Sequence, residues 1–199
     1  MHPDRRFHWD DRDAIRRFVA DVSFGTLFAG TPDGPRVVHL PVVWENDETL
    51  TLHVARGNAI TRHLDDATGL FVVNGPDGYV SPSWYGLGPD EVPTWNYVAA
   101  ELEGQVSRMD RDALAAQVRL LTSVHEDRLP GESWTPDKMD ANRWERMLDA
   151  IVGFRLRVQA WRGTVKVNQN KPAAARLRAA DGSAAAGRTA IAAMMRAWR

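Results

Sequence analysis

The junction around residue 56 carries the side chains best suited to binding an anion. Arg56, Gly57 and Asn58 follow an alternating stretch, Leu50–Ala55, that predicts a strand, and they precede a short helix predicted over Ile60–Asp66. A strand that ends in this way offers a guanidinium group, an amide donor and unpaired backbone N–H groups together. The three residues suit a phosphate-binding junction, but by themselves they favour the alternative, a solvated turn, in which the same residue types are common.

A second segment, Gly75–Val98, concentrates rings and prolines. It holds two tryptophans, all three tyrosines of the chain and four prolines. Within it, Ser81–Tyr85 and Val92–Tyr97 each place hydroxyl or amide groups beside a ring, as a site for a flat ligand with a polar edge requires. The alternative is a structural loop whose aromatic side chains close one end of a barrel.

Several other chemistries are excluded by residue type or spacing. The chain has no cysteine, which excludes disulfides, thiolate zinc sites and cysteine nucleophiles. His39, His53 and His63 lack the spacing and the matching carboxylate of a metal site, so no metal is predicted. Ser81 and Ser83 lie outside any G-x-S-x-G motif, and the phosphate-loop and dinucleotide fingerprints are missing. Flavin mononucleotide (FMN) fits what remains, with its phosphate at the junction and its ring at the aromatic segment.

Composition and charge narrow the class of protein. With 25 basic and 26 acidic residues the net charge is −1, so the chain lacks the basic excess typical of a nucleic-acid binder. Its N-terminus is polar, unlike a secretory signal, and no apolar run approaches the roughly 20 residues of a membrane helix. We therefore expect a cytoplasmic protein with no membrane partner.

The apolar periodicity predicts an α+β protein with about seven strands. Strands are predicted over Gly25–Gly30, Arg36–Trp44, Leu50–Ala55, Thr68–Val73, Val92–Val106, Ile151–Val158 and Trp161–Val167. Helices are predicted over Asp11–Val22, Ile60–Asp66, Asp110–His125 and Ala141–Ala150, and at Ile191–Trp198. This pattern indicates a small closed or split barrel over residues 1–172, followed by a helical extension over residues 173–199 that packs on the barrel or on a partner subunit.

Six segments, in this order, carry a resemblance to a known family: Val38–Pro41, His53–Asn58, Gly75–Pro76 with Tyr79–Tyr85, Val92–Tyr97, Ile151–Gly153 and Lys166–Asn170. They are similar to the successive motifs of the FMN-binding negative transcriptional regulator family, the PaiB type. The resemblance implies an antiparallel split β-barrel with peripheral helices, similar to the pyridoxamine 5′-phosphate oxidase-like barrels. Those barrels are homodimers that hold FMN in clefts at the subunit interface.

The resemblance also implies roles for single residues. Arg56 and Asn58, with His53 on the same strand end, would hold the FMN phosphate, and the backbone of His39, Leu40 and Pro41 would run under the isoalloxazine ring. Six further residues would reach the cofactor, some of them from the partner subunit: Thr94, Trp95, Asn96, Lys166, Gln169 and Asn170. The chain departs from the family at two positions, with Asn168 in place of serine and Thr164 in place of lysine.

Two functions of different classes follow from the resemblance. The first is a flavoprotein that regulates transcription; because no helix-turn-helix or basic arm is visible, DNA contact is unsupported and a protein partner is the expected route. The second is a flavin-dependent oxidoreductase acting on a small molecule, with His39, Tyr85 and Trp95 on the substrate side of the ring and no assigned catalytic residue. A module that stores or senses flavin or haem is a third reading, which the fold does not separate from the others.

Overall fold

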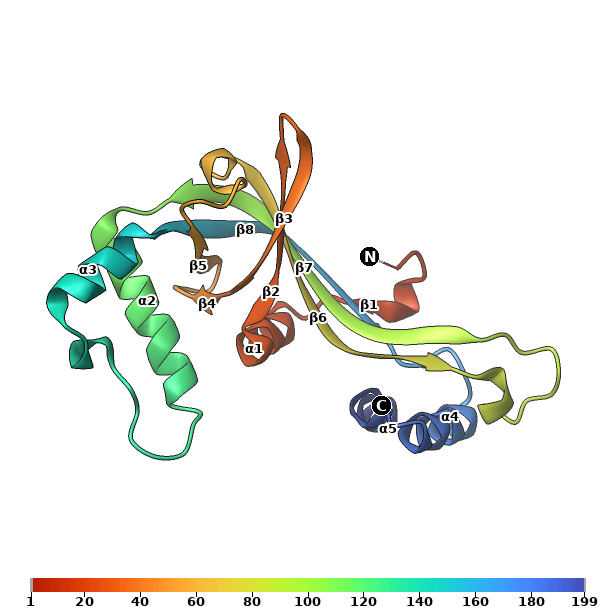
Figure 1. The fold of residues 1–199 in the computed structure, drawn as a ribbon. Helices are drawn as coiled ribbons and strands as arrows, with labels where there is room; N and C mark the ends of the chain where they lie inside the picture. Colours follow the sequence, from red (N-terminus) through yellow and green to blue (C-terminus); the bar gives the residue numbers. More distant parts are fainter. Residues whose placement is uncertain (1, 199) are drawn as a thin grey trace. The chain divides into compact units, whose positions relative to one another are not determined.

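The structure is a computed structural model that describes residues 2–198, so residues 1 and 199, the outer ends of the two predicted domain ranges, lie outside it. The strands are β1 His8–Trp9, β2 Phe24–Thr31, β3 Gly34–Pro41, β4 Val43–Trp44, β5 Thr49–Ala55, β6 Thr68–Val80, β7 Thr94–Arg108 and β8 Ile151–Lys166 (Figure 1). The α-helices are α1 Arg12–Val22, α2 Arg111–Glu126, α3 Ala141–Asp149, α4 Ala173–Ala185 and α5 Thr189–Ala197. Short 3-10 turns lie at η1 Arg5–Phe7, η2 Thr61–His63, η3 Pro82–Trp84 and η4 Pro136–Lys138.

The sheet has the strand order β3-β2-β6-β7-β8-β5-β4, with β1 paired to β8. The pairings of β2 with β3 and β6, of β4 with β5, and of β5 and β1 with β8 are antiparallel. The predicted α+β class with an antiparallel sheet is therefore confirmed. None of the helices within residues 2–198 is both long enough and apolar enough to cross a membrane.

The chain forms two compact units, and β6, β7 and β8 contribute residues to both. The first unit comprises Met1–Ile15, Asn74–Glu101 and Arg162–Arg199, and the second comprises Arg16–Val73 and Leu102–Trp161. This division does not test the predicted domain boundary at residue 172, which stays a prediction.

The second unit is built on the hairpin of β2 and β3 and on the pairing of β5 with β8. Leucines and phenylalanines of β2, β5, β6, β7 and β8 are fully buried in its core: Leu27, Leu50, Leu52, Phe71, Leu102, Phe154 and Leu156. The rings of Trp44 and Trp161 stack at 5.5 Å with an angle of 8° between their planes. The Trp44 indole N–H also donates to the carbonyl of Arg16 at 3.2 Å, which ties α1 to β4.

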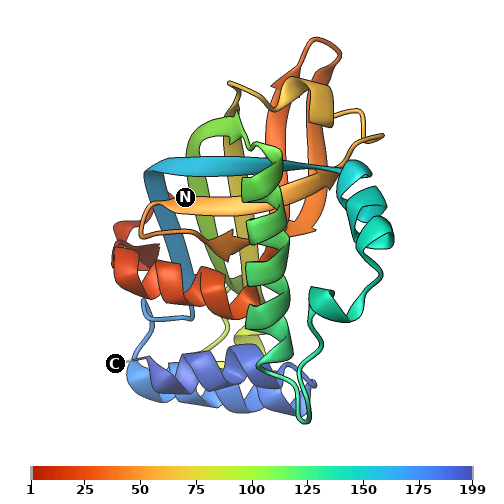
Figure 2. The same cartoon turned by 90° about the vertical axis from the view of Figure 1, so that its left-hand side faces the viewer.

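Helix α2 lies against β4 and β5 of the same unit (Figure 2). Asp110 caps its N-terminus by accepting from the Ala113 N–H at 2.8 Å, as the sequence predicted, and Leu114 and Leu121 are buried beneath it. Asp140 caps α3 in the same way, accepting from the Arg143 N–H at 2.9 Å. Each cap satisfies a backbone N–H group in the first turn of its helix.

In the first unit, α4 and α5 lie side by side, and α4 also contacts η3 (Figure 2). Asp181, Gly182 and Ser183, which interrupt the alanine-rich composition, are part of α4. Gly182 has a packing reason: a Cβ at this position would overlap the indole ring of Trp84. The guanidinium of Arg178 on α4 donates to the Tyr85 carbonyl at 2.9 and 2.5 Å, which holds the segment after η3 against the helix.

Four predicted elements differ from the structure. β6 continues through the turn-like residues after Val73 to Val80, and the two last predicted strands form the single strand β8, because pairing with neighbouring strands outweighs local propensity. The strand predicted over Arg36–Trp44 is divided at Val42 into β3 and β4, and the helix predicted over Ile60–Asp66 is only the 3-10 turn η2.

Substitution of Gly104 on β7 tests how closely the backbone of β7 approaches that of β8 in the second unit. A Cβ there would overlap the Arg157 carbonyl oxygen and lie 2.7 Å from its carbonyl carbon. We expect Gly104→Ala to lower the free energy of unfolding by about 1–3 kcal/mol or more, because neither backbone can move without breaking the ladder. Gly30→Ala on β2, where a Cβ meets nothing within 4 Å, is the control and should change it by less than about 0.5 kcal/mol. Urea unfolding measures both; equal effects would contradict the close approach.

Candidate functional site

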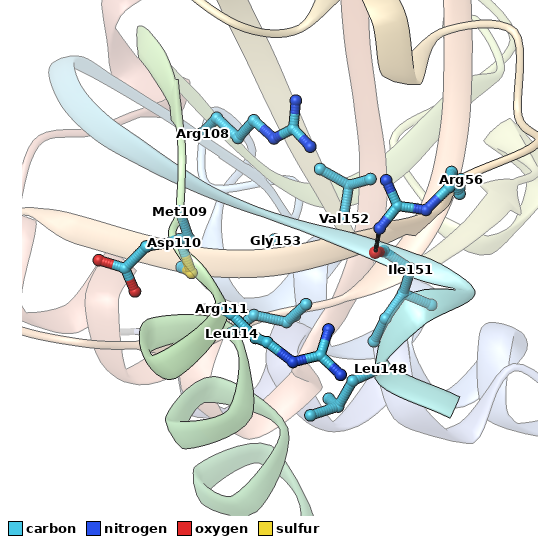
Figure 3. A pocket seen from close by; sticks show the side chains of 10 residues that line it. All are labelled: Arg56, Arg108, Met109, Asp110, Arg111, Leu114, Leu148, Ile151, Val152 and Gly153. Atoms are coloured by element: carbon cyan, nitrogen blue, oxygen red, sulfur yellow. Dashed lines mark hydrogen bonds between the residues drawn. The ribbon is translucent and has the colours of Figure 1, made fainter. Parts of the chain in front are cut away.

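An arginine pocket lies in the second unit, at the junction that the sequence singled out. It encloses about 110 Å³, and Arg56, Arg108 and Arg111 line it together with the backbone at the start of β8 (Figure 3). Three segments supply the arginines: the turn after β5, the end of β7 and the first residue of α2. Long-range pairing therefore brings three cations to one hollow.

Arg56 is fixed by three successive backbone carbonyls. Its Nε donates to the carbonyl of Asp149 at 2.6 Å, its Nη2 to that of Ile151 at 3.1 Å, and its backbone N–H to that of Ala150 at 2.8 Å. These are carbonyls at the C-terminal end of α3, where a cation is favoured. The bonds orient the guanidinium group, and no described residue accepts a hydrogen bond from its Nη1.

The charges in the arginine pocket are unequally balanced. Arg111 is paired with Glu145 at 2.5 Å and with Asp149 at 2.7 Å, and these hydrogen bonds raise the pKa of its guanidinium. Among residues 2–198, the guanidinium groups of Arg56 and Arg108 form no ion pair with a carboxylate; Asp65 accepts from the backbone N–H of Arg108 at 2.8 Å, and Asp110, which also lines the pocket, caps α2. Two guanidinium groups without an ion pair fit a phosphate, which accepts from such groups in a bidentate way.

Asn58 and His53, which were also predicted to bind the FMN phosphate, do not line the arginine pocket. The Asn58 side chain accepts from the Ile60 N–H at 3.1 Å and shapes the turn after β5. His53 Nδ1 lies 2.9 Å from Oε1 of Gln117 on α2, and His53 lines a neighbouring pocket of about 280 Å³ with Trp134 and Trp144. This tryptophan pocket shares two wall residues, Leu148 and Ile151, with the arginine pocket.

The predicted ring-binding residues lie on β3 in the same unit. Leu40 is buried, whereas His39 is exposed and its Nδ1 lies 2.9 Å from the Thr26 hydroxyl. The register pairs Thr26 with His39, Phe28 with Val37 and Phe24 with Pro41, so these residues share one face of the hairpin. We call Phe24, Phe28, Val37, His39 and Pro41 the hairpin face; its Phe24, Phe28 and Val37 are 54%, 38% and 46% exposed.

A lysine pocket of about 190 Å³ lies in the first unit and brings three other predicted residues together. Thr94, Lys166 and Asn170 line it, and Nζ of Lys166 donates to the Thr94 hydroxyl at 2.7 Å. Lys171, which the sequence did not single out, also lines the pocket and pairs with Glu91. Burial lowers the pKa of the Lys166 ammonium group.

Three predicted residues lie apart from the lysine pocket. Trp95 is half exposed, donates from its indole N–H to Asp77 at 2.9 Å and contacts the edge of Tyr79. Asn96 is fully buried, and neither atom of its amide finds a hydrogen-bond partner within the described residues. Gln169 accepts from the Val167 N–H at 2.8 Å and donates to the carbonyls of Val165 and Arg6 at 2.5 and 3.0 Å.

The sequence interpretation predicted no binding role for Arg108, Asn168 or Lys171, although it named Asn168 within the segment Lys166–Asn170. Arg108 had no motif, because it joins Arg56 only through the pairing of distant strands. The sequence did contain a signal for Lys171, because lysine is rare in this chain, with three among 25 basic residues. In the structure, two of the three lysines line one pocket.

The hydrogen bonds of Gln169 test whether this residue is structural. Gln169→Ala removes one acceptor and two donors from three backbone groups, so we expect it to lower the free energy of unfolding by about 1–3 kcal/mol. Gln159→Ala, at an exposed position of β8, is the matched control. A normal stability combined with weaker FMN binding would instead support the cofactor contact that the resemblance implies.

Comparison with known proteins shows the family and the fold. Residues 1–160 match the family described as "Putative FMN-binding domain". "Protease synthase and sporulation protein PAI 2" of Bacillus subtilis (strain 168) is 30% identical over 176 residues, which are 86% of this chain and 83% of that protein.

Two solved structures share the fold. The FAD and heme binding protein of Mycobacterium smegmatis superposes with a TM-score of 0.59 at 16% identity, over 80% of this chain and 73% of that one. The flavocytochrome Anf3 of Azotobacter vinelandii superposes with a TM-score of 0.60 at 14% identity, over 83% of this chain and 72% of that one. The predicted split barrel is thus confirmed, and the family match confirms FMN as the predicted cofactor. Sequence, fold and family model agree that the chain belongs to the FMN-binding family of the PaiB type.

Proposed function

We propose that this protein is a homodimeric flavoprotein whose FMN phosphate binds in the arginine pocket, and that it serves as a PaiB-type negative regulator of transcription. The observation that carries the proposal is that the guanidinium groups of Arg56 and Arg108 line one pocket and form no ion pair with a carboxylate of the described residues, while Asp110, which also lines the pocket, caps α2. A phosphate supplies the missing negative charge.

The residues of the second unit have distinct tasks in this proposal. Arg56 is held in place by the carbonyls at the end of α3, so it binds a phosphate without first losing side-chain freedom. Arg108 has no side-chain partner to give up, and Asn58 keeps the turn in place. When bound, FMN supplies the capacity to accept and donate electrons, and the protein supplies its position and surroundings.

The hairpin face supports the proposed homodimer. Its exposed aromatic and aliphatic side chains form an apolar surface on the outside of β2 and β3, with the exposed His39 among them. Such a surface, rimmed by polar residues, is typical of a protein interface. A second copy of this chain is the occupant that the resemblance implies, with FMN held between the subunits.

Regulation through a protein partner agrees with the charge of the chain. The net charge of −1 offers little attraction for DNA phosphates. The Bacillus subtilis relative is named a protease synthase and sporulation protein, and a regulatory role in this chain is compatible with that name. The absence of cysteine is compatible with the predicted cytoplasmic location.

A flavin-dependent oxidoreductase acting on a small molecule is the second candidate, and the tryptophan pocket favours it. This pocket adjoins the arginine pocket and is large enough for a small apolar compound beside His53. Reduction of bound flavin by NADPH would favour the enzyme. A band shift of promoter DNA that weakens steeply with salt would favour direct DNA binding.

Titration of the apoprotein with FMN tests the phosphate site. We expect Arg56→Ala and Arg108→Ala each to raise Kd at least about tenfold, because a hydrogen bond to a charged group contributes about 1.5–3 kcal/mol and 1.4 kcal/mol is tenfold. Arg143→Ala, which removes the same charge from an exposed position of α3, should bind like the wild type. Flavin fluorescence quenching gives Kd, and thermal unfolding of each variant checks its fold. Wild-type affinity in the Arg108→Ala variant would contradict the site.

Sedimentation velocity tests the hairpin face as the dimer interface. We expect the wild type at twice 22.3 kDa and Val37→Asp at 22.3 kDa, because a carboxylate would be buried without a partner in the interface. Leu129→Asp, which charges another exposed apolar position of the same unit, should remain dimeric. A monomeric wild type, or a dimeric Val37→Asp, would overturn this interface.

A further inference from the structure

We propose that the lysine pocket binds a small organic acid through its carboxylate, with Lys166 as the counter-charge and Asn168 as a buried hydrogen-bond donor. The pocket belongs entirely to the first unit, whereas the arginine pocket belongs to the second. The site is therefore additional to the proposed FMN phosphate site and does not depend on it.

Asn168 supplies the first observation. Only 2% of this residue is exposed, and its φ of 63° lies in the left-handed region that asparagine tolerates. Its side chain lies near the Tyr85 hydroxyl and offsets part of the rise that burial causes in the Tyr85 pKa. Its Nδ2 nevertheless makes no hydrogen bond of normal geometry with any described residue. A buried donor without a hydrogen-bond partner destabilises the protein, and an acceptor oxygen of a ligand in the pocket would remove that cost.

The backbone holds this donor in place. The carbonyl of Asn168 accepts from the Lys171 N–H at 3.0 Å, and Gln169 binds three backbone groups around it. The loop after β8 is thus fixed before any ligand arrives, which lowers the entropic cost of binding.

The charges of the lysine pocket favour a monoanion. Lys171 pairs with Glu91 and lies 5.0 Å from the centre of the Tyr85 ring. Lys166 donates to the neutral Thr94 hydroxyl, lies 5.7 Å from the Phe7 ring and has no carboxylate partner in the described part of the chain. His2 also lines the pocket, and its Nδ1 accepts from the Asp4 N–H at 3.1 Å. One ammonium charge without an ion pair remains, and a carboxylate balances it better than a phosphate dianion does.

The other residues that line the lysine pocket indicate the size and polarity of the part of the ligand beyond its carboxylate. Phe7 and Tyr85 are buried, and Val92 and Pro93 complete an apolar side of the pocket. The volume of about 190 Å³ is below the roughly 300–1,000 Å³ of pockets for drug-sized ligands. We therefore infer a small acid with an apolar body, and benzoate is a suitable probe.

Lysine-selective NMR tests the proposal without the cofactor. The chain has three lysines, so a protein labelled at lysine gives three side-chain signals. We expect benzoate to shift the Lys166 signal in a saturable way and to leave that of the exposed Lys138 unchanged. The affinity should fall as the pH rises through the lowered pKa of Lys166, because the neutral amine no longer balances the carboxylate.

Variants identify the donors. Lys166→Met and Asn168→Ser should each weaken benzoate binding at least tenfold, measured by calorimetry, and Lys138→Met should bind like the wild type. Wild-type NMR needs no variant, so a variant that fails to fold leaves the test intact. Absence of a saturable Lys166 shift, or tighter binding of inorganic phosphate than of benzoate, would overturn the proposal.

Competition with FMN separates this proposal from the cofactor site. The resemblance assigns Thr94, Lys166 and Asn170 of this pocket to the cofactor, so we expect benzoate to bind the FMN-saturated protein as it binds the apoprotein and not to displace FMN. Displacement, together with weaker FMN binding by Lys166→Met, would show that the lysine pocket holds the cofactor and would overturn the organic-acid site. A failure of the Arg56 and Arg108 variants to weaken FMN binding would instead affect only the proposed phosphate site.

Discussion

The bonds from Arg56 to three successive carbonyls hold the second unit together at its functional end. They join the end of β5 to the last residues of α3 and the first residue of β8, where the pairing of β5 with β8 begins at Ala55 and Ile151. Charge-assisted bonds to carbonyls at a helix C-terminus are stronger than neutral ones. One side chain therefore both fixes a strand junction and presents a cation to the arginine pocket.

The two pockets use the two kinds of cation differently. The arginine pocket contains planar guanidinium groups. That of Arg56 donates to backbone carbonyls, and that of Arg111 donates to carboxylates. The lysine pocket contains compact ammonium groups, of which one is paired and the other partly desolvated. Arginine suits the bidentate recognition of phosphate, whereas a desolvated lysine behaves as a point charge for a small anion. The different chemistry supports different ligands for the two units.

The residues that the resemblance assigns to the cofactor have different roles in the structure. Arg56, Thr94, Lys166 and Asn170 line pockets, as binding residues must. Gln169 uses its amide on the backbone of its own loop, and Asn58 shapes a turn, so a structural task explains both. Motif residues thus include those that build a site as well as those that touch a ligand.

The sequence by itself determined the fold class, most of the elements and the family. Alternation predicted the strands, Asp110 marks the predicted start of one helix, and six ordered motifs indicated an FMN-binding split barrel. These signals are local, since each depends on a few neighbouring residues. Only the tertiary structure decided which distant residues share a pocket. Arg108 joins Arg56, and Lys171 joins Lys166 around the buried amide of Asn168, because strand pairing and burial depend on residues far apart in the chain.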